Sequence, residues 1–202
     1  MGPLGLGDRN NGRMGRVYDE ISESLGTFLE AQPVFFVATA PLDANGMMNC
    51  SPKGNRGEFV VLGPHRVAYL DQTGSGIETV AHLRENGRIV IMFCAFAGPP
   101  RIVRLHGRGQ FAVPGTDLFD EIGPRFDGRE GAGVRAIIAV DVTRVSDSCG
   151  NGVPFMAFES HRPTMDQWST RKGPEGIREY QNEKNLVSLD GLAGLDATPP
   201  PR

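Results

Sequence analysis

The stretch Ala68–Phe96, AYLDQTGSGIETVAHLRENGRIVIMFCAF, decides the fold. Its apolar start ends at Asp71, and the run Gly74-Ser75-Gly76 provides a turn. Apolar residues then recur at helical spacing up to Asn86-Gly87, which is a helix-stop signal. The run Ile89–Phe96 is apolar and β-branched, which predicts a buried strand. We therefore expect a strand, a glycine turn, a short helix and a second strand.

The turn before this predicted helix has the chemistry of an anion site. Free backbone amides and the positive end of the helix dipole both suit a phosphate. Most Gly-Ser-Gly turns carry no ligand, and Ser75 can equally cap the helix. The hydroxyl of Thr79 is a second candidate donor to the same anion. His82 has no metal-spaced partner, which favours a structural or exposed position.

The totals exclude several classes of protein. The chain has 202 residues, a net charge of −3 and 39% hydrophobic residues, which is typical of one globular domain. This charge gives no reason to expect nucleic acid or an anionic membrane as a partner, and no apolar run is long enough to span a bilayer. The N-terminus lacks the apolar core of a secretory signal, so a cytoplasmic location is expected.

Three cysteines lie far apart in the chain and form no CxxC pair. This pattern argues against a disulfide framework and against a zinc site, so we expect no metal. Cys50 and Cys94 fall in strand-like runs and are expected to be buried thiols, whereas Cys149 falls in a loop.

The rest of the chain reads mainly as strands. Residues 1–13 and 196–202 are predicted to be disordered, and residues 14–195 to form a single domain with a C-terminal helical segment at about 160–185. An apolar stripe predicts a helix over 17–31, and Gly173-Pro174 should split the C-terminal helix. Pro52 should end the second strand. About six antiparallel strands with helices at the ends indicate a small β-barrel.

Five runs of the sequence, taken in order, resemble the pyridoxamine 5'-phosphate oxidase-like flavoproteins: FFVATAPLD, NCSPKGN, YLDQTGSGIETVAHLRENGRIVIMFCAF, GPPRIVRLHGRG and VPFMAFESHR. The resemblance covers roughly residues 14–195. It implies a mainly β protein with flanking helices, the six-stranded antiparallel Greek-key split β-barrel that binds FMN. It also implies a homodimer with the cofactor at the interface. FAD, a deazaflavin or haem are the alternative cofactors.

The same resemblance implies a set of cofactor-binding residues. One strand would line the isoalloxazine ring, with Lys53 as a cation near the ring or its phosphate, and Ser75 would belong to the phosphate turn. With Thr79, added from its place after the turn, the candidate cofactor-binding residues are Asn49, Cys50, Ser51, Lys53, Leu70, Asp71, Ser75, Thr79, Met92 and Phe93. Arg104 and Arg108 lie on the polar face of a later strand, which is expected to face either solvent, a partner subunit or an anionic substrate.

The turn departs from the oxidase pattern. The oxidase has Ser-Arg-Lys at this point, whereas this chain has Ser75-Gly76-Ile77, so two phosphate cations are missing. Either Lys53, Arg56 or Arg88 supplies the charge, or the site holds a compound other than FMN. The C-terminal element with which the oxidase grips pyridoxal phosphate has no clear counterpart. We therefore do not expect vitamin B6 oxidation.

No acid–base or nucleophilic constellation is recognisable, as expected for a protein whose cofactor carries the chemistry. No catalytic residue is therefore assigned. The favoured hypothesis is an FMN-dependent oxidoreductase that passes a hydride through flavin N5. The donor would be a reduced nicotinamide or deazaflavin and the acceptor a small organic substrate. The alternative is a non-catalytic binding or storage protein for flavin, deazaflavin or haem.

Overall fold

The computed structural model describes residues 15–55, 57–129, 131 and 133–197. Its centre is one antiparallel sheet of eight strands in the order β3-β2-β6-β7-β8-β5-β4, with β1 paired to β8. The strands are β1 (Val17–Tyr18), β2 (Val34–Thr39), β3 (Asn49–Gly54), β4 (Phe59–Gly63), β5 (Arg66–Gln72), β6 (Arg88–Cys94), β7 (Ile102–Ala112) and β8 (Val134–Ser148). The predicted antiparallel β architecture with flanking helices is confirmed. The expected count of six strands was wrong, because short segments such as β1 also join the sheet.

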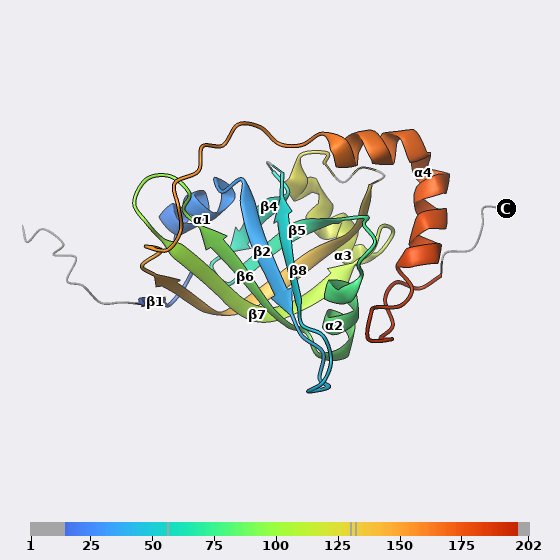
Figure 1. The fold of residues 1–202 in the computed structure, drawn as a ribbon, viewed down its shortest axis with the longest axis horizontal. Coiled ribbons are helices and arrows are strands. Elements are labelled where there is room, and N and C mark those ends of the chain that lie inside the picture. The colour runs from blue at the N-terminus through green and yellow to red at the C-terminus, as the bar shows by residue number, and fades with distance from the viewer. Residues whose placement is uncertain (1–14, 56, 130, 132, 198–202) are drawn as a thin grey trace, which may run out of the picture.

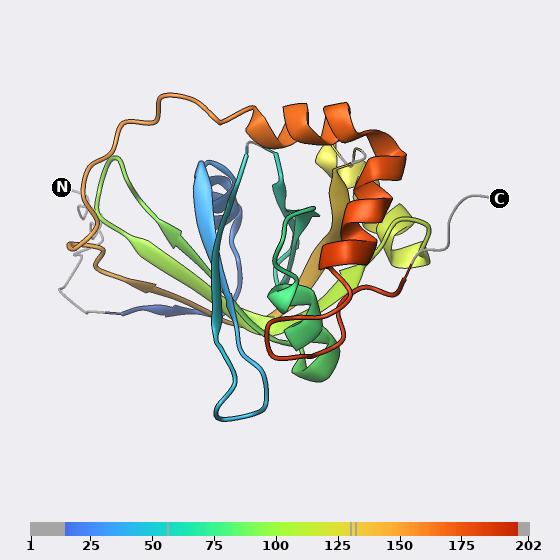
Figure 2. The same ribbon diagram turned by 45° about the vertical axis from the view of Figure 1, so that its right-hand side comes forward.

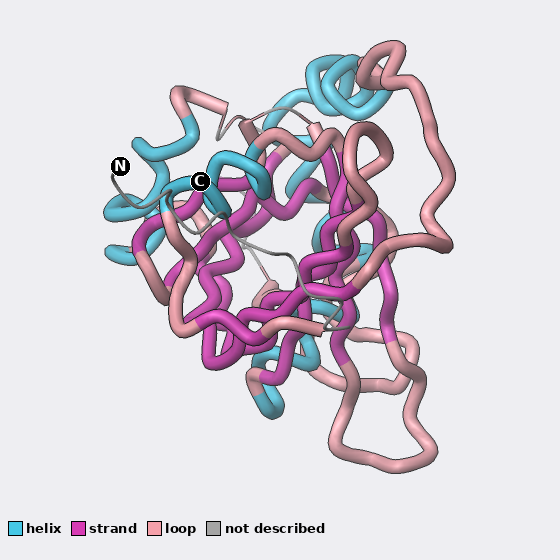
Figure 3. The backbone as a smooth tube through the Cα atoms, turned by 90° about the vertical axis from the view of Figure 1, so that its left-hand side faces the viewer, coloured by secondary structure: helices cyan, strands magenta, loops and turns pink. Residues whose placement is uncertain are grey.

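The sheet curls so strongly that its two ends face each other (Figures 1 and 3). Aromatic side chains meet inside this curl. The ring of Phe35 on β2 lies 5.4 Å from Phe59 on β4, 5.4 Å from Tyr69 on β5 and 5.5 Å from Phe93 on β6. Burial of each such side chain contributes about 1.5–3 kcal/mol, so these rings hold the two ends of the sheet together.

A second apolar cluster lies on the opposite face of β5 and β8. There the helices α3 (Asp117–Ile122) and η1 (Gly123–Phe126) pack on the sheet. Strands β5 and β8 are thus covered on both faces, which explains their nearly continuous apolar sequences.

The remaining helices are α1 (Glu23–Glu30), α2 (Glu78–Asn86) and α4 (Thr164–Lys184). Helix α1 starts later than the predicted residue 17, because Ser22 caps it by accepting the Leu25 amide at 3.3 Å. The predicted break in α4 is confirmed, since Gly173 has a φ of 66° and a ψ of 173°. In Figure 2, the second half of α4 runs down beside α2. Within the described ranges, no helix combines the length and the hydropathy needed to cross a bilayer.

Strand β3 continues through Pro52, so the expected break there was wrong. Pro52 pairs with Phe36 of β2, and β3 lies at one end of the sheet. A proline is tolerated in an edge strand, where its missing N–H faces no partner strand. Because β3 remains regular, every second side chain points to the same face, so Asn49, Ser51 and Lys53 share one face of the strand. Phe35 of β2 pairs with Lys53 and therefore lies on the same face of the sheet.

The predicted disordered segment at residues 1–13 lies outside the described residues. Of the predicted tail at residues 196–202, only Asp196 and Ala197 are described.

A tight approach between β7 and β8 makes Gly107 sensitive to substitution. The register shifts between His106 and Gly107, and a Cβ at Gly107 would collide with the backbone oxygen of Asp141. We expect Gly107→Ala to lower the free energy of unfolding by about 1–3 kcal/mol in urea denaturation. Gly63→Ala is the matched control, because a Cβ there meets nothing within 4 Å. Equal losses for the two variants would contradict this account.

Candidate functional site

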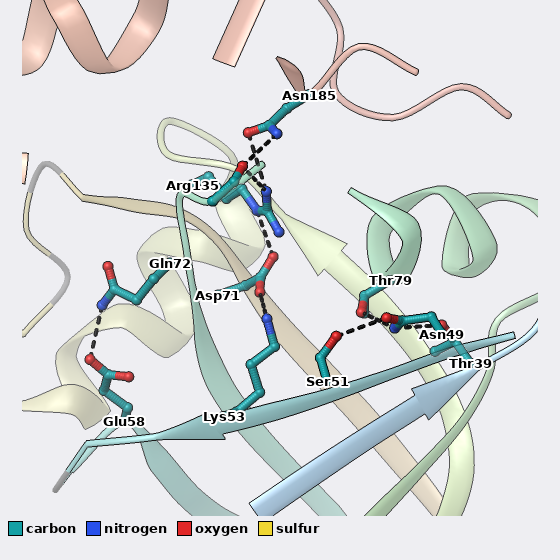
Figure 4. Close-up of polar contacts among 11 residues, drawn as sticks. Thr39, Asn49, Ser51, Lys53, Glu58, Asp71, Gln72, Thr79, Arg135 and Asn185 are labelled. Atoms are coloured by element: carbon teal, nitrogen blue, oxygen red, sulfur yellow. Dashed lines mark hydrogen bonds and ion pairs between the residues drawn. The ribbon is translucent and has the colours of Figure 1, made fainter. Parts of the chain in front are cut away.

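The carboxylate of Asp71 links three strands. Asp71 on β5 is fully buried, at 0% exposure. Lys53 Nζ on β3 lies 2.6 Å from its Oδ1, and Arg135 Nε on β8 lies 2.8 Å from its Oδ2 (Figure 4). Because β3 is at one end of the sheet and β5 and β8 are near the other, this ion cluster bridges the two ends. Two cations around one carboxylate leave one positive charge in excess.

Asp71 stays ionised in the folded protein. Burial raises the pKa of its carboxyl group, but the charges and hydrogen bonds of Lys53 and Arg135 outweigh burial and lower the pKa to about 2. Asp71 therefore carries its negative charge over the whole physiological pH range.

Beside the ion cluster lies a chain of neutral polar side chains. Ser51 Oγ donates to Asn49 Oδ1 at 2.8 Å, and Asn49 Nδ2 donates to Thr39 Oγ1 at 3.2 Å and to Thr79 Oγ1 at 3.0 Å. Figure 4 shows these four side chains converging from β2, β3 and α2. The amide of Asn49 joins the edge strand to the first turn of α2.

The two cations of the cluster and three residues of the polar chain, Asn49, Ser51 and Thr79, line one pocket with a cavity volume of about 160 Å³. Its wall is formed by Asn49, Ser51, Lys53, Gln72, Gly74, Gly76, Glu78, Thr79 and Arg135. At Gly74 an added Cβ would meet nothing within 4 Å, so the turn is open towards its surroundings. Helix α2 begins at this turn, and its N-cap, Ile77, makes no side-chain hydrogen bond to the helix amides. The wall also carries one carboxylate, Glu78, whose Oε1 accepts the Leu189 amide at 3.4 Å.

Residues at the end of α4 bind the segment that leads into the glycine turn before α2. Asn185 Nδ2 donates to the Gly74 carbonyl at 2.8 Å, and Asn185 Oδ1 accepts from Arg135 at 3.2 Å. Gln181 Nε2 donates to Thr73 Oγ1 at 2.8 Å. Asn185 is itself fully buried, at 0% exposure. These contacts fix both the carbonyl of the turn and the guanidinium of Arg135.

Sequence reasoning missed Arg135 and Asn185. For Arg135 a signal was available, because a single arginine interrupts a continuously apolar strand and must find a buried partner. Asn185 gave no comparable signal, since it follows a polar helix and its partners lie far back in the chain.

The structure brings five of the ten predicted site residues together. Asn49, Ser51, Lys53 and Thr79 line the pocket, and Asp71 binds Lys53 at its base. Four of them were selected by the family resemblance and one, Thr79, by its position after the turn. The placement is observed; whether these residues bind a cofactor stays a prediction.

The other five do not form part of the pocket wall. Cys50 is exposed on the opposite face of β3, so the expectation of a buried thiol there was wrong, whereas Cys94 is buried as predicted. Leu70 packs with α3 and η1, and Phe93 lies in the aromatic core. Met92 is half-buried and alternates with Phe93 onto the other face of β6.

Ser75 is exposed on the turn but does not cap α2, because the cap position falls on Ile77. The interpretation of Ser75 as an N-cap was therefore wrong, and its role as a phosphate ligand stays a prediction.

Of the three predicted sources of positive charge, only Lys53 is seen in the pocket wall. Arg88 is exposed and donates instead to the Pro41 carbonyl at 3.0 Å. Arg56 lies outside the described residues. On β7, Arg104 donates to Ser148 Oγ at 3.0 Å and Arg108 to the Asn86 carbonyl at 2.6 Å.

Removing the charge of Asp71 should destabilise the fold strongly. Asp71→Asn leaves Arg135 buried without its counter-ion, so we expect the free energy of unfolding at neutral pH to fall by about 3–5 kcal/mol. Because the pKa of Asp71 is lower in the folded than in the unfolded protein, wild type loses this stabilisation as the pH falls from about 4 through about 2. The variant has no carboxyl group at this position, so its stability should lack this part of the pH dependence. Urea denaturation at several pH values measures both effects.

Asp196→Asn is the matched control, since its ion pair with Arg84, at 3.4 Å, is exposed. It should cost less than about 1 kcal/mol. A similar loss for the two variants would show that the Asp71 cluster does not hold the sheet ends together.

Comparisons with known proteins agree with this architecture. The sequence model described as pyridoxamine 5'-phosphate oxidase matches residues 21–149. The pyridoxamine 5'-phosphate oxidase family protein ustO of Aspergillus flavus is 38% identical over 192 residues, which is 88% of this chain and 77% of the relative. A crystal structure of a HupZ variant from Group A Streptococcus shares the fold, with a TM-score of 0.50 and 23% identity over 63% of this chain and 98% of that one. The chain therefore belongs to the pyridoxamine 5'-phosphate oxidase family.

Proposed function

We propose that this protein is an FMN-dependent oxidoreductase that acts on a small organic substrate by hydride transfer through flavin N5. The observation that carries the proposal is the pair of cations, Lys53 and Arg135, in the wall of the pocket at the open glycine turn where α2 begins. Membership of the family supports it.

The residues present fit the phosphate end of a flavin nucleotide. Lys53 and Arg135 supply the positive charge that the glycine turn itself lacks, and the amides at the start of α2 supply uncharged donors. Gly74 leaves room for an anion to approach the backbone. Lys53 and Arg135, from two strands, thus take the place of the arginine and lysine of the oxidase turn, which supports FMN against the alternative of a compound other than FMN.

The pocket of one chain is too small for a whole flavin nucleotide. A cavity of about 160 Å³ falls well below the roughly 300–1,000 Å³ typical of small-molecule sites. Large apolar side chains are exposed at the β2–β3 turn, where Met48 is 82% exposed, and on the segment before α4, where Phe155 is 84% exposed. Exposed apolar groups of this size are typical of interaction surfaces. The proposal therefore includes a homodimer in which a second copy covers the ring system.

In this mechanism the protein binds and orients, and the flavin supplies the hydride and electron chemistry when it is bound. Lys53 and Arg135 would hold the phosphate. Asp71 keeps both cations in place, and Asn185 keeps the Arg135 guanidinium from turning away. Ser51 and Asn49 form a polar wall that can orient the part of the ligand next to the phosphate.

Haem fits this pocket less well than flavin. Haem iron takes an axial His, Cys, Met or Tyr ligand. The described residues that line the pocket include none of these four types. A non-catalytic flavin-binding protein is the second candidate, because both cations of the described pocket wall are engaged by Asp71 and would serve binding equally well without turnover.

Titration of the purified protein with FMN, followed by flavin fluorescence, tests the cofactor. We expect Lys53→Met to weaken FMN binding about tenfold to a hundredfold, because a charge-assisted hydrogen bond is lost. Glu78→Gln should strengthen binding about twofold to fivefold, because it removes a like charge near the helix N-terminus. Arg88→Met is the matched control, since Arg88 points elsewhere, and it should leave the affinity unchanged. No uptake of FMN by wild type would overturn the proposal.

Reduction of the bound flavin separates the enzyme from the storage protein. Under anaerobic conditions, a reduced nicotinamide or deazaflavin should bleach the visible flavin band of the loaded protein. A flavin that stays oxidised with both donors, although free FMN in the same buffer is reduced by dithionite, would favour the storage protein.

A further inference from the structure

His82 is a buried histidine that the proposed flavin site does not use directly. Its side chain in α2 is 0% exposed, and its Nδ1 lies 2.9 Å from Thr39 Oγ1. Its Nε2 is also buried and has no hydrogen-bond partner among the described residues. Buried polar atoms without a partner are rare in folded proteins, so this imidazole needs an explanation.

The imidazole is neutral in the folded protein. Burial lowers the pKa of His82, and the surrounding carboxylates of Asp190, Glu78 and Glu85 oppose this only in part. In the protonated ring both nitrogens would be donors, so Nδ1 could not accept from Thr39. A neutral ring has one donor and one acceptor nitrogen, so its tautomer fixes the direction of the bond to Thr39.

From His82 a chain of hydrogen bonds leads to the pocket. Thr39 Oγ1 accepts one hydrogen of the Asn49 amide, and Thr79 Oγ1 accepts the other. Asn49 Oδ1 in turn accepts the hydroxyl hydrogen of Ser51 (Figure 4). The hydroxyl hydrogen of Ser51 is thus donated to Asn49, a neighbouring residue of the wall. The lone pairs of the Ser51 oxygen are left to accept a hydrogen bond from a ligand in the pocket.

We propose that His82 is a positioning residue that acts through Thr39 and Asn49 to present Ser51 Oγ to the ligand as a hydrogen-bond acceptor. With Asn49 donating to Thr39 Oγ1, the hydrogen of Thr39 is available for His82 Nδ1, and the proposal places it there, so that Nδ1 is the unprotonated nitrogen. A continuous run of donors and acceptors from Ser51 to His82 strengthens each bond and offsets the unpaired Nε2–H.

The opposite tautomer would leave the direction of the hydrogen bonds in the wall unfixed. If Nδ1 carried the proton, Thr39 Oγ1 would accept from His82 with one lone pair. Thr39 could then either accept from Asn49 with the other lone pair or donate its own hydrogen to a turned amide, which would make Ser51 a donor. The observed arrangement selects a ligand that brings a hydrogen-bond donor to Ser51, which deepens the proposed flavin function and rests on it.

The tautomer can be measured without any flavin. We expect ¹⁵N NMR of the free protein to show an unprotonated Nδ1 and a protonated Nε2 for His82. Thr39→Val, which keeps the side-chain volume, should shift both nitrogen signals of His82 and leave those of His106, on the exposed face of β7, unchanged. A protonated Nδ1 in wild type, or His82 signals that do not respond to Thr39→Val, would overturn the proposal.

A double-mutant cycle on FMN affinity tests the transmission to the pocket. Thr39→Val and Ser51→Ala should each weaken binding about fivefold, and the double variant no more than the weaker-binding single variant. Independent effects, which multiply to about 25-fold, would contradict a positioning role. His82→Phe should match Thr39→Val, and if it does not fold, Thr39→Val carries the test alone.

His106→Gln is the matched histidine control and should leave the affinity for FMN unchanged. Absence of FMN binding by wild type would overturn the proposed flavin function, and the NMR result would then decide by itself whether His82 directs the chain as inferred.

Discussion

A buried carboxylate must be neutralised, and the rest of this structure depends on how Asp71 meets that requirement. Its two partners come from strands at different places in the sheet, Lys53 on β3 and Arg135 on β8. The sheet can satisfy all three groups only by curling until its ends approach. Packing of the aromatic core favours the same curvature, but apolar contacts do not require particular partners. The ion cluster, by contrast, fixes which side chains meet. The ion cluster around Asp71 therefore contributes both to the stability of the fold and to the geometry of the site.

Much of the fold was predictable from the sequence because it follows from local signals. The strand, glycine turn, helix and strand of Ala68–Phe96 appear as the apolar spacing and the Asn86-Gly87 stop indicate. The errors came where local and tertiary signals compete. Val17 and Tyr18 fit a helical stripe, but Ser22 caps the helix later and β8 recruits both residues. Pro52 reads as a strand break, yet an edge strand accommodates it.

The site was predictable only in part, for a reason that lies in the geometry of strands. A family motif is a continuous run of letters, whereas successive side chains of a strand point to opposite faces. Asn49 and Ser51 reach the pocket, so Cys50 between them cannot. The same alternation separates Leu70 from Asp71. Arg135 and Asn185 were not predicted as site residues. Their contacts with the site depend on the register of β8 against β5 and on the position of the end of α4, which no local sequence pattern encodes.

The contacts of Asn185 with Gly74 and Arg135 affect the order in which the site can form during synthesis. Asn185 closes on Gly74 across 111 positions of the chain, after every strand of the barrel has been made. A chain synthesised only as far as β8 contains Lys53, Asp71 and Arg135 but not Asn185, which contacts both the Arg135 guanidinium and the Gly74 carbonyl. Such long-range closure is slow compared with local structure. The turn before α2 is therefore among the last parts of the structure to be fixed.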